Sequence, residues 1–389
     1  MTAVREIPFG RPWIDDTDRA AVDRVLHGHI LTHGPECKAF EADFAGFMGP
    51  GANAVSMSSC MAALHMAYVN FGIGPGDEVI VAAQTHVATA HAVEFVGAKP
   101  VFVDCDPVTG NVTAERIAAQ ITPRTKAIGL IHFCGVPCDM APIVALADKH
   151  GLKIIEDCAI AIGSRIGDKH VGLFGDVATF SFYPVKHITT GEGGMFVSRH
   201  AEVAQSVAKL RAFGVDRSKS ATLIPGAYDV PQVGINYRMS EMSAALGRTQ
   251  MLKLPEILRR RAANFASLRD RLLKVEGVRV LDQDPRLAKG TTQSHYCLVP
   301  VLEAPLASKR DEIVRGLNAR GIGTSVYYPQ PVPRMAFYKQ KYGYEAGRFA
   351  NAEQISDHGF ALPVGPHLTE EDMQYVGDAF ASVVQEART

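Results

Sequence analysis

The sequence of 389 residues predicts an α/β fold with a mainly parallel central sheet and a smaller α+β domain at the C-terminus. Short β-branched runs alternate with helical patterns over the first two-thirds of the chain, which is typical of βαβ units. After Tyr237 comes a long, almost wholly helical segment. From about Gly277 onward, strand-like and helix-like segments mix. The first observation predicts the large sheet, and the other two predict the second domain.

The strands of the sheet are expected where short apolar runs are bounded by turn residues. These runs are "NAVSMS" (53–58), "DEVIVAA" (77–83), "KPVFVDCD" (99–106), "AIGLIHF" (127–133), "LKIIEDC" (152–158), "VATFSF" (177–182) and "GMFVSR" (194–199). Helical patterns such as "CMAALHMAYVNFG", "ATAHAVEFVG" and "APIVALADKHG" separate several of them. In parallel sheets ligands bind beyond the carboxyl ends of the strands, so we expect the site there.

The C-terminal third begins with the helical stretch 239–275, which we expect Pro255 to kink or break. Further on, "HYCLVPVL" (295–302) predicts a strand, and "SKRDEIVRGLNARG" (308–321) predicts a helix that ends at a glycine cap. We therefore place a large domain at 15–254 and a small domain at 255–389, with segment 1–14 packing on the small one.

Composition limits the classes of function. Apolar residues make up 47% of the chain, charged residues 21%, and the net charge is −1, so neither nucleic acid nor an anionic membrane is an expected partner. We see no apolar run long enough to span a bilayer and no signal peptide. Seven scattered cysteines argue against a disulfide framework and favour the cytoplasm.

A metal site is not expected. Cys134 and Cys138 lie four residues apart with His132 nearby, but a zinc site needs a second pair of ligands with a similar spacing, and the sequence shows none.

Three features fall near the carboxyl ends of predicted strands. Lys186 follows "VATFSF", Asp157 ends "LKIIED", and "SSCMAAL" leads the first strand into a helix. An amine for a Schiff base, an acid for a pyridine nitrogen and a helix N-terminus for a phosphate would suit pyridoxal 5'-phosphate. The main alternatives are a solvated lysine and an aspartate that caps a turn.

The chain also resembles the DegT/DnrJ/EryC1/StrS family of sugar aminotransferases, which are fold-type I pyridoxal phosphate enzymes. The similarity runs nearly from end to end. Its most specific segments are "GDVATFSFYPVKHITTGEGG" (175–194) and "GINYRMSEMSAALGRTQMLKL" (234–254), supported by "IIEDCAIAIGS" (154–164) and "ALPVGPHLTEED" (361–372).

The resemblance implies roles for individual residues. Lys186 matches the Schiff-base lysine, and Asp157 matches the partner of the pyridine nitrogen. Ser181 matches a phosphate-binding hydroxyl, and His86 occupies the place of an aromatic side chain that stacks on the ring. Asn236 matches a residue that reaches the cofactor phosphate of the neighbouring subunit, which implies a homodimer with shared active sites.

Four positions near these residues are also assigned by resemblance. Arg238 is a candidate for the same interface or for an anionic group of the substrate. Ser59, Cys60 and Met61 stand where the family usually has Asn-Gly-Thr, so backbone N–H groups replace a threonine hydroxyl at the phosphate.

Two further positions depart from the family. Ile160 stands where relatives often have a polar residue near the ring oxygen. Tyr327 and Pro333 stand where relatives commonly have histidines, so substrate contacts near Tyr327 are expected to differ.

The function that this resemblance implies is the transfer of an amino group from glutamate or glutamine to a nucleotide-linked keto sugar. Three alternatives stay open. One is an aminotransferase for a cyclitol or another cyclic ketone. The second is a sugar dehydratase, although such relatives carry histidine where this chain has Lys186. The third is a regulatory homologue without catalysis.

Overall fold

The computed structural model describes residues 5–216 and 228–388. Its centre is a seven-stranded sheet in the order β1-β9-β8-β5-β4-β2-β3. The strands are β1 (Asn53–Met57), β2 (Glu78–Ala82), β3 (Lys99–Val103), β4 (Thr125–Ile131), β5 (Lys153–Asp157), β8 (Val177–Ser181) and β9 (Gly194–Ser198). All seven coincide with runs that the sequence predicted, and the mainly parallel α/β class is confirmed.

Only β9 runs against the other strands of this sheet, since it pairs antiparallel with both β8 and β1. The connection from β8 to β9, residues 182–193, contains no helix. A parallel pairing would need a crossover connection, usually a helix, whereas a direct loop can join antiparallel neighbours. This loop contains Lys186, so the topology places that residue at the carboxyl end of β8.

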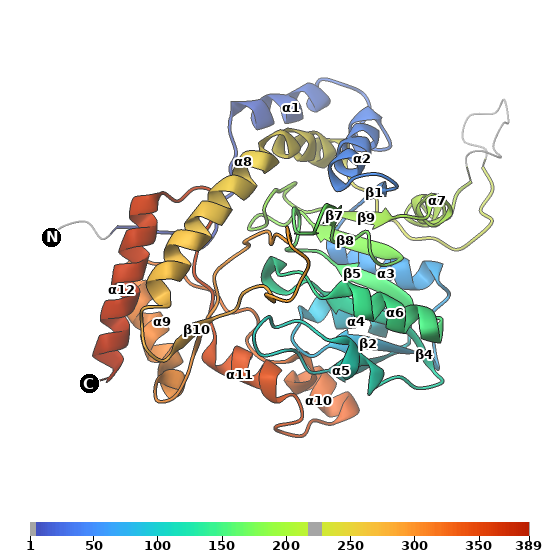
Figure 1. Cartoon of the computed structure of the whole chain (residues 1–389). Coiled ribbons are helices and arrows are strands. Elements are labelled where there is room, and N and C mark those ends of the chain that lie inside the picture. Colours follow the sequence, from blue (N-terminus) through green and yellow to red (C-terminus); the bar gives the residue numbers. More distant parts are fainter. Residues whose placement is uncertain (1–4, 217–227, 389) are drawn as a thin grey trace.

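Helices cover the sheet and enclose its core (Figure 1). They are α3 (Cys60–Asn70), α4 (Val87–Phe95), α5 (Ala114–Ala118), α6 (Met140–His150) and α7 (Ala201–Leu210). At the N-terminal end, α1 (Asp16–Leu26) and α2 (Pro35–Met48) pack on the first half of α8 (Glu241–Leu272). A two-stranded ribbon of β6 (Arg165–Ile166) and β7 (Lys169–His170) follows β5.

Helix α8 continues without a break through Pro255, contrary to the break that we considered. Pro255 is exposed, so water can satisfy the carbonyl group that loses its helical partner. Packing holds both halves of the helix, because α1 and α2 contact the first half and α12 (Glu370–Arg388) contacts α8 in the C-terminal part (Figure 1). The predicted division between residues 254 and 255 falls inside this helix and stays a prediction.

The C-terminal part has a core of its own. This part of the chain contains β10 (Val278–Val280), β11 (Pro300–Leu302), α9 (Arg310–Ala319), α10 (Ala336–Tyr342), α11 (Ala350–His358) and α12. The N-terminal segment lies on it: Ile7 N–H donates to Gly321 O at 2.9 Å, and Ile7 is buried in this core.

Two predicted elements of the C-terminal part had different outcomes. Helix α9 ends as expected, with Gly321 at φ 76° just beyond it. The strand predicted at 295–302 is shorter, because only Pro300–Leu302 pairs as β11. His295 has φ 50°, outside the extended region, so a continuous strand cannot begin there.

No helix among the described residues is long and apolar enough to cross a membrane.

Candidate active site

A cavity of about 290 Å³ lies where β5 and β8 end and where α3 and α4 begin. The residues predicted for the site that line it are Ser59, Cys60, Met61, His86, Asp157, Ser181 and Lys186. These residues come from five separate parts of the chain. The sheet brings them together because the carboxyl ends of parallel strands share one edge.

Lys186 is held on a tightly closed loop. Its backbone N–H donates to Tyr183 O at 2.9 Å, and further on Thr190 N–H donates to Phe182 O at 3.0 Å. The Thr189 hydroxyl donates to the same carbonyl at 2.9 Å. The threonines after the lysine therefore close the loop back onto its start, and burial lowers the pKa of the Lys186 amine below its usual value.

Asp157 is 2% exposed, and neighbouring donors fix the orientation of its carboxylate. The Thr89 hydroxyl donates to Oδ2 at 2.8 Å, and Ala159 N–H donates to Oδ1 at 3.0 Å. The Cys60 thiol lies 3.9 Å from Oδ1 and 3.5 Å from the hydroxyl of Thr179. The carboxylate therefore stands fixed at the cavity wall, where it can accept a hydrogen bond from a cationic ring.

The N-terminus of α3 forms another wall of the cavity. Ser59 caps this helix, and its hydroxyl accepts from Ala62 N–H at 3.0 Å. The first N–H groups of a helix have no partner within it, so those of Cys60 and Met61 can receive an anion. Strand β9 passes so close that a Cβ atom on Gly194 would lie 2.5 Å from Cys60 N.

The two remaining predicted residues of the cavity lie on its wall. Ser181 ends β8, and its hydroxyl is 3.4 Å from Tyr183 N. His86 is exposed and caps α4, where its Nδ1 accepts from Ala88 N–H at 3.2 Å. The His86 ring lies 5.5 Å from the ring of Tyr328.

Four predicted residues do not line the cavity. Ile160 is buried in the core of the sheet. Tyr327 is outside the cavity lining, with its hydroxyl 2.6 Å from that of Tyr296. Asn236 is exposed, and Arg238 lies over the ring of Phe213 at 5.0 Å.

Sequence reasoning did not assign several residues to the site. Thr89 orients Asp157, and Tyr183, Glu192 and Tyr328 line the cavity. Thr89 follows His86 by three residues, which is one turn of α4, so helical spacing was a usable signal for it. No local pattern points from Tyr328 to the cavity, because it comes from a distant loop.

The residues considered for a metal serve the core instead. His132 Nε2 lies 2.9 Å from Glu156 Oε2, and His132 Nδ1 accepts from Cys138 N–H at 3.1 Å. Glu156 also accepts from two backbone N–H groups, those of Gly172 and Gly175. Cys158 lies within 4.8 Å of this pair, but both ring nitrogens of the histidine already have partners.

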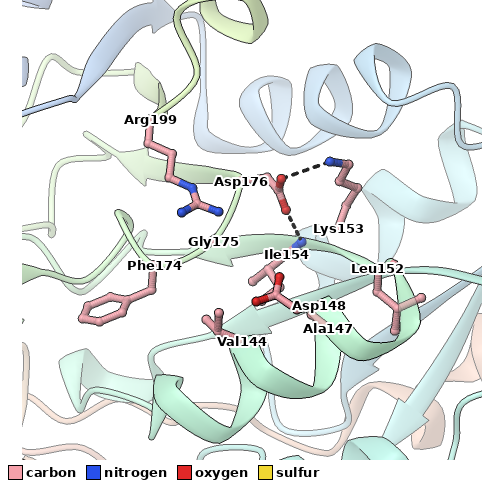
Figure 2. Close-up of a pocket in the computed structure, with 11 residues that line it drawn as sticks. Val144, Ala147, Asp148, Leu152, Lys153, Ile154, Phe174, Gly175, Asp176 and Arg199 are labelled. Atoms are coloured by element: carbon pink, nitrogen blue, oxygen red, sulfur yellow. Dashed lines mark hydrogen bonds and ion pairs between the residues drawn. The ribbon is translucent and has the colours of Figure 1, made fainter.

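A second cavity, of about 220 Å³, lies near the opposite ends of β5 and β8 (Figure 2). The carboxylate of Asp176 in this cavity already has partners. It accepts from Lys153 Nζ at 3.1 Å and from Ile154 N–H at 2.9 Å. None of the predicted site residues lines it.

Known proteins share this architecture over nearly their whole length. The model of the DegT/DnrJ/EryC1/StrS aminotransferase family matches residues 12–381. The spore coat polysaccharide biosynthesis protein SpsC of Bacillus subtilis is 33% identical, and the alignment covers 98% of each chain.

Solved structures agree with this relationship. DesV of S. venezuelae, solved in complex with a ketimine intermediate, is 34% identical with a TM-score of 0.87, over 97% of this chain and 99% of DesV. Spr1654 of Streptococcus pneumoniae, solved in its PMP form, is 25% identical with a TM-score of 0.92, over 98% and 100% of the two chains. It was also solved in its PLP form. The chain belongs to the DegT/DnrJ/EryC1/StrS aminotransferase family and has the fold of type I pyridoxal phosphate enzymes.

Proposed function

We propose that this enzyme transfers an amino group from glutamate or glutamine to a keto sugar that is linked to a nucleotide. Membership of the family makes the chain a pyridoxal phosphate-dependent sugar aminotransferase. The similarity to SpsC, which is named for polysaccharide biosynthesis, supports a nucleotide-linked sugar, because such sugars are the activated precursors of polysaccharides. The observation that carries the proposal is that Lys186 and Asp157 face one cavity with a helix N-terminus.

The residues of this cavity fit pyridoxal phosphate. The Lys186 amine would bond the cofactor aldehyde, and the fixed Asp157 carboxylate would accept from its ring N–H. The N–H groups at the start of α3 and the Ser181 hydroxyl would receive the phosphate. His86, exposed on the wall, would cover one face of the ring. When bound, this cofactor supplies an electron sink that lets a donor lose its α-hydrogen as a proton.

With the cofactor bound, Lys186 would have a second task once the amino donor has displaced it. Its amine would take the proton from the α-carbon of the donor and return it at C4′ of the cofactor. A lowered pKa favours this task, because more of the amine is neutral and can act as a base. The acceptor would then bind in the same cavity, and the steps would run in reverse. The two substrates would therefore bind alternately.

The proposed phosphate cradle consists of the first N–H groups of α3 and the Ser181 hydroxyl. Most of its donors are therefore backbone groups. Cys60 and Met61 offer no hydroxyl, and the Cys60 thiol lies against Asp157 and Thr179. The close passage of β9 at Gly194 holds the start of α3 in place.

The partner subunit would complete this cradle in a homodimer. Asn236 is exposed and does not line the cavity of its own chain, which suits a residue that serves the neighbouring site. We also place the enzyme in the cytoplasm, because its seven cysteines are free thiols.

A two-step absorbance experiment tests the function. Glutamate or glutamine should shift the visible band of the bound cofactor, and a nucleotide-linked keto sugar should restore it. The same keto sugar without its nucleotide is the matched control and should restore the band far more slowly. Equal rates for the two sugars would contradict the nucleotide link, and a band that no amino donor shifts would contradict aminotransfer.

A further inference from the structure

The ring of Tyr296 lies beside the Lys186 amine. Lys186 Nζ lies 5.1 Å from the centre of the Tyr296 ring, a distance at which an ammonium group is attracted to the π face. In the described residues, Nζ makes no hydrogen bond and no ion pair. The ring of Tyr296 is therefore a direct contact of an amine that has no ion-pair partner within these residues.

Tyr296 is itself held rigidly. It is 3% exposed, and its hydroxyl lies 2.6 Å from the hydroxyl of Tyr327. Arg261, which is 5% exposed, donates from Nη1 to the carbonyl oxygen of Tyr296 at 2.7 Å. The guanidinium of Arg261 also lies 5.8 Å from the centre of the Tyr296 ring. Contacts at both the backbone and the hydroxyl thus fix where the ring stands.

A further contact ties the Tyr296 segment to the loop of Lys186. His187, the next residue after the lysine, has its Nε2 2.9 Å from the carbonyl oxygen of Ser294. A carbonyl oxygen can only accept, so Nε2 carries the proton and donates. The His187 ring also lies 5.6 Å from the ring of Tyr296. The lysine and the aromatic ring are therefore parts of one connected assembly, although they lie over 100 residues apart in the sequence.

We propose that Tyr296 is a positioning residue whose ring holds the Lys186 ammonium in the cavity whenever that amine is not bonded to the cofactor. The inference rests on the proposed role of Lys186. During turnover the displaced amine must stay close to the reacting carbon and must not swing into solvent. A π face attracts the ammonium group without placing an anion against it. The amine can therefore still release the proton that it has accepted.

Other groups also act on the Lys186 amine. Burial lowers its pKa, and the charge of Asp157 raises it. The groups around the amine from the neighbouring elements are Cys60, His86, Cys134, Asp157, His187 and Cys297. These groups stay in place when only the side chain at position 296 is changed, so a set of variants at this position isolates the ring.

The pKa of Lys186 in the full chain without cofactor provides the test. It is measured from the pH dependence of acetylation by acetic anhydride, with mass spectrometry of the peptide that contains Lys186. Tyr296→Leu removes the π face and should lower the pKa by about one unit. Tyr296→Phe and Tyr327→Phe both remove the contact between the two hydroxyl groups, but they keep the π face and the bond from Arg261 to the carbonyl of residue 296. Both should therefore leave the pKa close to that of the wild type.

A graded series guards against failure of Tyr296→Leu to fold. Phenylalanine with one, two or three ring fluorines at position 296 keeps the shape of the ring while its π face weakens. The pKa of Lys186 should fall step by step with each fluorine. The proposal would be overturned if the pKa of Lys186 did not change with the number of fluorines. It would also be overturned if this pKa changed as much in Tyr296→Phe as in Tyr296→Leu.

A kinetic readout separates positioning from a structural role. Once saturated with glutamate, the fluorinated enzymes should lose kcat progressively at unchanged KM, since the ring acts after the donor has bound. Mapping of the cofactor-bonded lysine is independent of these measurements. If it assigned another lysine, the proposed role of Lys186 would fail even where the pKa series had succeeded.

Discussion

Asp157 and Asp176 are two carboxylates of the same sheet with different surroundings. Asp157 is oriented toward the cavity by Thr89 and Ala159, whereas Asp176 binds Lys153 and a backbone N–H near the opposite ends of the strands. Both accept hydrogen bonds of similar length. Their difference in position predicts that one serves the cofactor and the other the fold.

Asp157→Asn should therefore lower activity far more than stability. The variant loses a charged partner of the ring nitrogen, which weakens cofactor binding by about 1.5–3 kcal/mol and slows the chemistry further. Asp176→Asn is the matched control and should lower the free energy of unfolding while cofactor affinity stays near the wild type. Titration with cofactor and urea unfolding measure the two effects. Wild-type turnover in Asp157→Asn would show that this residue is not the ring partner.

The buried amine of Lys186 makes stability depend on pH in the protein without cofactor. Because its pKa is lowered on folding, protonation favours the unfolded chain, and this cost disappears as pH rises from the lowered pKa to about 10.5. Lys186→Met carries no such cost. We expect its advantage in unfolding free energy over the wild type to shrink as pH rises through that window. An advantage that grows with pH would contradict a lowered pKa.

Strand β9 approaches the start of α3 closely, backbone against backbone. A Cβ atom on Gly194 would lie 2.4 Å from the carbonyl carbon of Ser59 and 2.5 Å from Cys60 N. Backbone atoms cannot move aside as a flexible side chain can. The last glycine of "GEGG", Gly194, thus allows the strand to support the phosphate cradle.

Gly194→Ala should lower stability by about 1–3 kcal/mol and weaken cofactor binding, since the helix start must shift. Gly46→Ala is its control: Gly46 is exposed within α2, and a Cβ there meets no atom within 4 Å. That change should raise stability by about 0.5–1 kcal/mol. Thermal unfolding and cofactor titration compare the two variants. Equal cofactor affinity in both would disprove the support role of Gly194.

The sequence predicted the strands of the main sheet because buried β-branched runs carry a local signal. It did not predict that α8 would pass through Pro255, because packing on two sides outweighs the local cost of proline. The strand at 295–302 was overpredicted, since a side-chain contact from Arg261 and the left-handed His295 override its apolar pattern. Local patterns indicate elements, and tertiary packing decides where they end.

The candidate site was predictable only in part for a similar reason. Asp157 ends β5 and Lys186 lies on the loop after β8, so their place at the sheet edge could be inferred. Tyr296 and Tyr328 reach the same region from the C-terminal part of the chain. Their placement depends on long-range contacts such as the bond from Gln84 Nε2 to Tyr327 O at 3.1 Å, which no sequence pattern contains.

In the proposed homodimer, two chains share each active site. Lys186→Ala and Asn236→Asp should each be inactive alone, because each damages both sites of its own dimer. A hybrid dimer would combine one doubly damaged site with one intact site. Random exchange in an equal mixture makes half of the dimers hybrids, so about a quarter of the wild-type activity should return. No recovery, despite proven exchange of subunits, would mean that Asn236 serves the site of its own chain.

Lys186 is the residue that we expect to bond the cofactor in the cavity between β5, β8 and α3. Reduction of the loaded enzyme with borohydride, followed by peptide mapping, tests it most directly. We predict one cofactor label per chain, on the peptide that contains Lys186, and no label on the Lys186→Ala variant. A label on any other lysine, or no label in the wild type, would show that Lys186 does not bond the cofactor.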